Sequence, residues 1–310
     1  MSSKNNLINH YKAPKVSSTW IKKVNSGIYP SNNDLIEHLD IIHKCYAGFT
    51  EKVATSCRDS NGNNSYELLL NIIDKNKHKN SDVLDIACGS GVLLKLLSIK
   101  NFTLQSKLTG VDISDSELQL AHNKLSHLDI NLYKDKAQNL DFIENNSQDL
   151  IFCHWALTLM NPIIPVLKNV KRLLRNEGIF SAIIDGDINI APGYSEVHDI
   201  IYKQAQKECS MYGLIEIGDS RVRSAKSLNQ LIKEIFTDAE ITISSNVLSM
   251  KETPIILAKE VSKFFYASLV LSKNSRKTLI SDLEDYFFSK SIEGLSVFNL
   301  PVNQLIIKQN

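Results

Sequence analysis

Short apolar runs alternate with amphipathic segments over most of this chain. Runs with the length of a buried strand lie at 82–87, 108–113, 130–135, 149–154, 178–185 and 240–247, and the alternating stretch 300–310 suits a last strand. Segments with apolar residues at helical spacing lie between them, at 66–73, 92–98, 162–174 and 227–236, and a further helix begins at the apparent capping box S-D-S-E (114–117). This alternation is typical of a parallel sheet with helices on both faces. We therefore predict an α/β fold built on a doubly wound, mostly parallel, seven-stranded sheet.

Three regions depart from the alternation, and they predict the domain organisation. Residues 1–65 are polar with scattered aromatics, contain a helical stretch at 31–46, and end in the turn-rich segment 56–65, so they predict an N-terminal helical cap. Residues 187–224 are predicted to be an insertion with a helix at 194–209. Two helices, at 253–271 and 276–289, predict a helical lid over 250–299. The core domain is then 66–249, completed by 300–310.

The stretch V-L-D-I-A-C-G-S-G-V-L-L (83–94) is the first candidate for chemistry. Its glycines, Gly89 and Gly91, follow a predicted strand and precede a helix, which places them over the carboxyl end of a parallel sheet, where ligands bind. Glycine lets the backbone approach a ligand without an intervening side chain. Asp112 ends the next strand, 21 residues after Gly91, where a carboxylate can accept both hydroxyls of a ribose.

Two nucleoside cofactors fit this layout. A dinucleotide fingerprint requires G-x-G-x-x-G, but Leu94 stands at the third glycine, and Asp85 would lie near the pyrophosphate with the wrong sign of charge. A carboxylate suits a ligand with positive charge, such as the ammonium and sulfonium of S-adenosylmethionine. Asp85 could also cap the N–H groups of its own loop, and both roles can hold together. The segment D-K-A-Q-N-L (135–140), after the third strand, could bind an adenine edge.

These motifs resemble those of class I S-adenosylmethionine-dependent methyltransferases, which have a Rossmann-like fold. D-I-A-C-G-S-G is similar to their first motif, V-D-I-S to their second-strand acid, D-K-A-Q-N-L to their adenine loop and D-L-I-F-C-H-W-A-L to their fourth strand. G-D-S-R-V-R-S-A-K-S-L-N-Q-L (218–231) resembles the small-molecule, UbiE-like branch. Asn176-Glu177 replaces the usual Pro-Gly of a structural turn. The resemblance and the loop positions together imply cofactor contacts at Asp85, Ala87, Gly89, Gly91, Asp112, Ile113, Asp135, Ala137 and Cys153.

Other residues are candidates for catalysis and for the substrate pocket. His154, at the end of the fourth strand, is the candidate general base, or it lines the pocket as a neutral histidine. Trp155 is predicted in the substrate pocket or the core. His198 and Tyr202, one helical turn apart on the insertion, are predicted to face the cleft. Tyr46, on the cap, is predicted to close over the cofactor.

For some other polar residues a structural role is favoured over a functional one. Arg221 and Arg223 could bind a substrate carboxylate, but structural pairing is favoured. Cys88 and Cys153 are expected to be wall residues rather than nucleophiles. The pair Lys171-Arg172 is expected on a solvated face.

Composition restricts the partners. Lys plus Arg (35) nearly cancels Asp plus Glu (34), so neither nucleic acid nor an anionic membrane is expected as a partner. Five cysteines without C-x-x-C predict neither disulfides nor a metal site and fit a reducing, cytoplasmic location. We expect no signal peptide, and charges interrupt the apolar segment 255–271 well short of a membrane span.

The function predicted from the sequence is S-adenosylmethionine-dependent methylation of a small molecule at oxygen, nitrogen or carbon. In-line transfer from the sulfonium requires alignment and exclusion of water rather than a metal. Three alternatives stay open: a nicotinamide oxidoreductase, a non-catalytic S-adenosylmethionine-binding protein, and an enzyme of the same fold with a different reaction such as cyclisation. The acceptor and the oligomeric state are not readable from the sequence.

Overall fold

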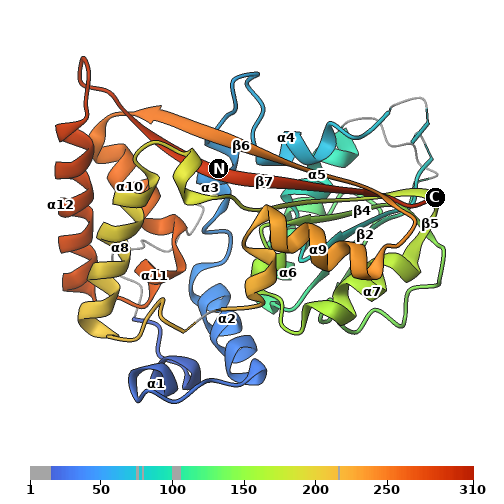
Figure 1. The fold of residues 1–310 in the computed structure, drawn as a ribbon, viewed down its shortest axis with the longest axis horizontal. Coiled ribbons are helices and arrows are strands. Elements are labelled where there is room, and N and C mark those ends of the chain that lie inside the picture. Colours follow the sequence, from blue (N-terminus) through green and yellow to red (C-terminus); the bar gives the residue numbers. More distant parts are fainter. Residues whose placement is uncertain (1–14, 75–76, 79, 100–105, 216) are drawn as a thin grey trace. The chain divides into compact units, whose positions relative to one another are not determined.

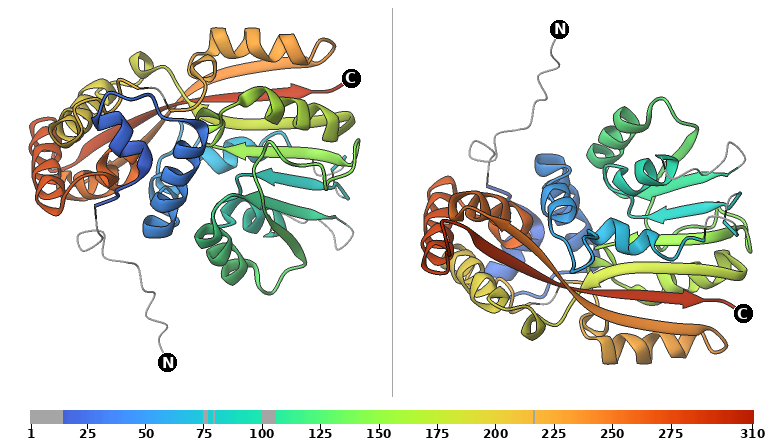
Figure 2. Two further views of the ribbon diagram at one scale, coloured as in Figure 1. Left: turned by 90° about the horizontal axis from the view of Figure 1, so that it is seen from below. Right: turned by 90° about the horizontal axis from the view of Figure 1, so that it is seen from above.

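The computed structural model describes residues 15–74, 77–78, 80–99, 106–215 and 217–310, and it divides into two compact units (Figures 1 and 2). Unit 1 comprises Met1–Val53, Glu196–Ile215 and Lys251–Phe298, and unit 2 comprises Ala54–Ser195, Glu216–Met250 and Asn299–Asn310. The predicted cap, insertion and lid stay predictions.

Unit 2 is built on a seven-stranded sheet in the order β3-β2-β1-β4-β5-β7-β6 (Figure 1). The strands are β1 (Val83–Ile86), β2 (Leu108–Asp112), β3 (Ile130–Lys134), β4 (Gln148–His154), β5 (Leu174–Asp185), β6 (Glu240–Glu252) and β7 (Ser296–Lys308). Strands β1 to β5 pair in parallel, and β7 runs antiparallel to β5. The strand order reverses between β1 and β4, and ligands of open α/β sheets bind at such a switch point.

The central strands of the unit 2 sheet are buried on both faces. One face packs against α7 (Ile163–Leu173) and α9 (Ala225–Ile235) in a single apolar cluster that includes Leu84, Ile151 and Phe180. The alternating residues Val83, Leu150, Phe152 and Ile183 are fully buried as well. All four residues of β1 are buried, as expected for a central parallel strand, and this explains the continuous apolar runs in the sequence.

The helices of unit 1 form its apolar core. They are α1 (Thr19–Asn25), α2 (Asn32–Tyr46), α10 (Pro254–Phe264), α11 (Tyr266–Leu269), α12 (Lys273–Ser289) and most of α8 (Tyr194–Glu208) (Figure 1). Ser31 caps α2 in a complete capping box with Asp34. Val16, Ile42, Tyr46, Phe49 and Leu269 form one buried cluster.

The predicted α/β fold with a mostly parallel seven-stranded sheet is confirmed, and the element boundaries differ in informative places. The single helix predicted at 253–271 is two helices, α10 and α11, because Phe265 adopts an extended conformation between them. Strands β5 and β6 begin or end several residues beyond the predicted limits. Helices α1 and α3 (Glu51–Ser56) were not predicted, because they are too short to show a helical period.

The predicted capping box at 114–117 is half correct. Ser114 caps α6 (Asp115–Leu125) and accepts the N–H of Glu117. The N–H of Ser114, however, is donated to Asp112 Oδ1 at 2.8 Å rather than to the Glu117 side chain. Asp112, the acid that ends β2, therefore also binds the backbone of the N-cap residue of α6. Pro162, predicted in the first turn of its helix, is the N-cap of α7 instead.

Among the described residues, no helix has both the length and the apolar character that a membrane crossing requires.

Gly110, in the middle of β2, is predicted to be essential for packing. A Cβ atom there would lie 2.8 Å from both Cys88 Sγ and Leu94 Cδ1 and 2.9 Å from Leu132 Cδ2. We expect Gly110→Ala to lower the free energy of unfolding by about 1–3 kcal/mol, as overpacking does. Chemical denaturation measures the change.

The double variant Leu94→Ala/Gly110→Ala is the control for that mechanism. Since one of the clashing atoms belongs to Leu94, the penalty of Gly110→Ala should be smaller in the Leu94→Ala background. Strictly additive penalties would show that the clash is not the cause.

Candidate active site

The loop after β1 turns back sharply to start α5 (Val92–Ile99). Ala87 has φ +58°, Gly89 φ +51° and Gly91 φ +76°, and the N–H of Cys88 bonds to the carbonyl of Val111 on β2. A left-handed conformation costs an L-residue such as Ala87 about 1–2 kcal/mol. Strain of this kind concentrates at ligand sites, where the surrounding structure holds it in place.

The two predicted glycines have different surroundings. A Cβ on Gly89 would meet only Glu117 Oε2, at 3.8 Å, so space is open beside this residue. A Cβ on Gly91 would lie 2.8 Å from Leu125 Cδ1 and 3.1 Å from Ala121 Cβ, both on α6. Gly91 therefore has a packing role that accounts for its presence, whereas Gly89 leaves an open cradle. Cofactor contact at both glycines stays a prediction.

Asp112 connects the glycine loop to the end of β2. Its Oδ2 accepts the N–H of Gly89 at 2.9 Å, and its Oδ1 accepts the N–H of Ser114 at 2.8 Å. A carboxylate can accept hydroxyl groups as well as N–H groups, because it has about four acceptor positions. Asp112, which is predicted to bind the ribose, thus also orients the glycine loop. The N–H of Asp135 bonds to the backbone carbonyl of Asp112, which brings the third loop to the same place.

Asp85 gives the site its electrostatic character. Its side chain is 1% exposed, and its Oδ1 atom has no hydrogen-bond partner. Burial, and then the charge of Asp112, raise the pKa of Asp85 well above its usual range. Asp112 and Glu117 are also buried. Asp112 and Glu117 lie next to Gly89, and Asp85 lies near Asp112. Buried carboxyl groups in this arrangement favour a cationic ligand over a pyrophosphate.

The predicted adenine loop is held from α7. Asn169 Nδ2 donates to the carbonyls of Ala137 and Gln138, both at 3.0 Å. Arg172 donates to the carbonyls of Leu140 and Ile143, each at 2.9 Å. Lys171 is exposed as expected, but the expectation of a solvated face is wrong for Arg172, which is half-buried and whose fork of donors binds two carbonyls of the loop.

His154, at the carboxyl end of β4, is held on two sides. Its Nε2 lies 2.9 Å from Ser65 Oγ, and its ring stacks on Tyr66 with centroids 3.9 Å apart and an interplanar angle of 17°. Burial lowers the pKa of His154 to about 3. The imidazole is consequently neutral near pH 7 and has a lone pair available for a proton or a hydrogen bond.

The chain leaves β4 through a second strained residue. Trp155 has φ +50°, its N–H bonds to the carbonyl of Ile183 on β5, and its ring lies 4.6 Å from that of His154. Asp185, the last residue of β5, interacts with the Thr158 hydroxyl and with the charge of Arg223. These side chains lie at the carboxyl ends of β4 and β5, the edge of the sheet where an acceptor would meet a cofactor.

The remaining predicted residues of unit 2 have structural surroundings. Cys153 is fully buried, and burial raises the pKa values of both Cys88 and Cys153, which leaves these thiols protonated. Ile113 is half-buried beside Asp112. The favoured pairing of Arg221 is confirmed, since it forms a two-pronged ion pair with Asp219.

Three predicted residues belong to unit 1. The Arg276 guanidinium lies 5.3 Å from the ring centroid of the buried Tyr46. The rings of His198 and Tyr202 stack on α8 with centroids 4.0 Å apart. Their predicted contacts with cofactor and substrate stay predictions.

Sequence reasoning missed Ser65, Tyr66 and Asn169. Asn169 carried a detectable signal, since a buried amide on the apolar face of an amphipathic helix requires partners. Ser65 and Tyr66 carried none, because 89 residues separate Ser65 from His154.

Part of the chain, including the glycine loop, is similar to known proteins. Residues 83–178 match the family model described as "Methyltransferase domain". A ribosomal protein L11 methyltransferase of Fusobacterium nucleatum is 29% identical over 132 residues, and the match spans 39% of either chain.

Solved structures share the fold. A candidate sarcosine dimethylglycine methyltransferase of Galdieria sulphuraria aligns with a TM-score of 0.52 and 14% identity over 79% of this chain and 85% of its own. A Haemonchus contortus phosphoethanolamine N-methyltransferase, solved with phosphomonomethylethanolamine and S-adenosylhomocysteine, aligns with a TM-score of 0.50 and 14% identity over 90% of this chain and 60% of its own.

The segment 83–178, which contains β1 to β4 and the glycine loop, thus matches a methyltransferase domain. The resemblance to class I S-adenosylmethionine-dependent methyltransferases is confirmed. The UbiE-like branch stays a prediction.

The unpaired Asp85 carboxyl predicts a trade-off between stability and ligand binding. We expect Asp85→Asn to raise the free energy of unfolding of the ligand-free protein at pH 7 by about 1–3 kcal/mol, the cost of an unpaired buried group. A carboxyl whose pKa is raised by folding destabilises the protein above its unfolded pKa, so the gain should vanish as the pH falls toward about 4. Urea denaturation at both pH values measures it.

Asp112→Asn is the matched control. Both oxygens of Asp112 accept backbone N–H groups, so this change should destabilise the protein. If Asp85→Asn destabilised the protein to the same extent at both pH values, the unpaired carboxyl would be ruled out as a cause of instability in the ligand-free protein.

Proposed function

We propose that this protein transfers a methyl group from S-adenosylmethionine to an oxygen, nitrogen or carbon atom of a small-molecule acceptor. One observation carries the proposal: in a segment that matches a methyltransferase domain, the buried Asp85 has an unpaired oxygen and lies near Asp112, which holds the N–H of the open Gly89. This arrangement matches a cationic cofactor. It opposes the nicotinamide alternative, whose pyrophosphate would meet three carboxyl groups.

The residues present fit the parts of this cofactor. Asp112 has lone pairs for the ribose hydroxyls, and the backbone between Asp135 and Leu140, held by Asn169 and Arg172, is available to an adenine edge. The carboxyl of Asp85 would neutralise the positive end, either directly or through the loop it shapes. Ala87, Gly89, Gly91, Ile113, Ala137 and Cys153 complete the proposed contact set, with Tyr46 from unit 1.

When bound, S-adenosylmethionine supplies an electrophilic methyl group on a positively charged sulfur, and that charge is lost on transfer. The protein's task is then to align the acceptor and to exclude water. Cys153, with its buried thiol, lies near the end of β4, the strand that pairs with β1. Trp155 follows β4 directly, at the edge of the sheet where the acceptor would bind.

His154 is the proposed general base for an acceptor that carries a proton. A pKa of about 3 in the ligand-free site makes the imidazolium costly. A proton taken up while a positive charge disappears nearby would leave the net charge of the site unchanged, which reduces that cost. An acceptor that is already deprotonated needs no base, and His154 would then orient it by a hydrogen bond.

The comparisons leave the acceptor open. The curated relative is described as acting on a ribosomal protein, and the nematode enzyme was solved with a small phosphorylated amine. We propose a small molecule with an apolar or aromatic part, in line with the UbiE-like resemblance. Trp155 is proposed to contact it, and His198 and Tyr202 stay predicted residues of the substrate pocket.

Titration calorimetry tests the cofactor assignment. We expect the stripped protein to bind S-adenosylmethionine and not NAD+, and we expect Asp112→Ala to weaken binding by about 1–3 kcal/mol, the scale of a lost charge-assisted bond. Asp141→Ala, which removes an exposed carboxyl of the same unit, should leave the affinity unchanged. NAD+ binding without S-adenosylmethionine binding would overturn the proposal.

His154 should affect turnover rather than cofactor affinity. With a phenol, amine and enol panel and isotopically labelled S-adenosylmethionine, we expect His154→Ala to lower kcat by about 10²–10⁴, the usual contribution of a positioned base. Because the pKa of His154 is about 3, activity should show no titration near pH 6.5. Cofactor binding without transfer to any panel member would instead favour the non-catalytic alternative.

A further inference from the structure

The hydrogen bonds around Ser65 have only one consistent direction. The Ser65 hydroxyl donates to the carbonyl of Ala54 at 3.2 Å, and a carbonyl oxygen can only accept. A serine hydroxyl has a single proton. With that proton directed to Ala54, Ser65 Oγ accepts at its other contact, the one with His154 Nε2 at 2.9 Å. This arrangement favours a proton on Nε2 of His154 and leaves the lone pair on Nδ1.

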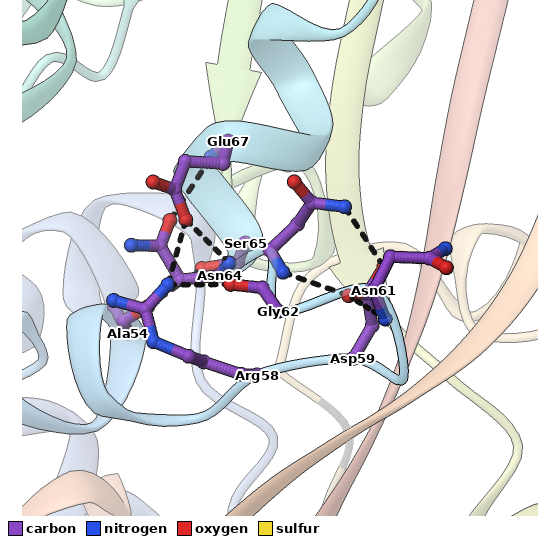
Figure 3. Close-up of polar contacts among 9 residues, drawn as sticks. Ala54, Arg58, Asp59, Asn61, Gly62, Asn64, Ser65 and Glu67 are labelled. Atoms are coloured by element: carbon purple, nitrogen blue, oxygen red, sulfur yellow. Dashed lines mark hydrogen bonds and ion pairs between the residues drawn. The ribbon is translucent and has the colours of Figure 1, made fainter.

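The position of Ser65 is set by the loop before α4 (Ser65–Leu70), which Figure 3 shows. Asn64 and Glu67 form a complete capping box at the start of the helix. Arg58 donates to Glu67 at 2.9 Å and to the carbonyl of Gly62 at 2.6 Å, which closes the loop on itself. Residues 58 and 249 exchange backbone hydrogen bonds, so the loop is also attached to β6.

Tyr66 restrains the same ring from its face. The stacked arrangement, at 3.9 Å and 17°, holds the plane of the imidazole, while the contact with Ser65 Oγ determines which nitrogen lies at that edge. Ser65 and Tyr66 are adjacent at the first turn of α4, where one side chain reaches the edge of the ring and the other its face. Ser65 is fully buried, so water cannot replace its oxygen.

We propose that Ser65 and Tyr66 are positioning residues that commit His154 to the Nε2–H tautomer, so that Nδ1 is the atom that accepts the proton of the methyl acceptor. In that step the Nδ1 lone pair forms the new N–H bond, and the acceptor keeps the electron pair of its broken O–H or N–H bond. This proposal rests on the proposed function, which supplies the reaction that His154 serves.

Unit 1 contains a second serine–histidine pair, Ser18 and His38, which can be compared with Ser65 and His154. Ser18 Oγ lies 2.9 Å from His38 Nδ1, and His38 stacks on Trp20 with centroids 4.8 Å apart and an angle of 15°. The serine here contacts the opposite ring nitrogen, and it also accepts the N–H of Ile21 as the N-cap of α1. Its hydroxyl proton is thus available to Nδ1 of His38. A variant at Ser18 should alter His38 and leave His154 unchanged.

Nitrogen-15 NMR of the histidine-labelled, ligand-free full chain tests the assignment, with His154→Gln identifying the signals of His154. We expect Nε2 of the wild type at the shift of a protonated ring nitrogen, Nδ1 at that of an unprotonated one, and a slowly exchanging Nε2–H. Ser65→Ala should make this proton exchange roughly tenfold faster, the effect of losing one net hydrogen bond. Ser65→Thr should restore the slow exchange, and Ser18→Ala should change only the signals of His38.

Two results would overturn the proposal: a proton on Nδ1 of His154 in the wild type, or unchanged exchange in Ser65→Ala. The wild-type measurement does not depend on Ser65→Ala, so it stands even if that variant fails to fold. Because no cofactor is present, the outcome is independent of S-adenosylmethionine binding. Failure of the proposed function would appear in the calorimetry instead, with the tautomer of His154 unaffected.

Discussion

The carboxyl group of Asp85 is the constraint around which the site is arranged. It is buried at the end of a central parallel strand, where no backbone donor reaches one of its oxygens. Such a group destabilises a protein that has no use for it, because burial disfavours its charge. The neighbouring Asp112 adds to the cost and also holds the glycine loop by its backbone. A cationic cofactor turns this local destabilisation into binding energy.

The acceptor side of the site follows a different principle. There the protein provides a neutral ring rather than a charge, and it controls which nitrogen of that ring holds the proton. His154 is restrained at its edge by Ser65 and on its face by Tyr66, and both residues come from the helix that begins after the loop at 57–64. The loop has no chemistry of its own. Its ion pair and capping box place two adjacent side chains against a strand far along the sequence.

Strain and packing separate residues that look alike in the sequence. Ala87 and Trp155 both take left-handed conformations directly after β1 and β4, the strands on either side of the switch point. Gly89 and Gly91 both have positive φ angles, yet only Gly89 has open space beside it, whereas Gly91 lies against α6. The same motif therefore serves two purposes: one glycine leaves room for a ligand, and the other lets a helix approach.

The fold class, the alternation of strands and helices along the core and the acidic glycine loop were determined by the sequence, because they rest on local patterns. Buried parallel strands are continuous apolar runs, and Asp85, Asp112 and Ser114 lie at fixed offsets from them. The boundaries of α10 and α11, the partner of the Ser114 N–H and the role of Arg172 were decided only by tertiary contacts. The same holds for the proton on His154. The ring nitrogen that carries this proton depends on Ser65 and on the carbonyl of Ala54. The fold brings both to His154 from a distant part of the chain.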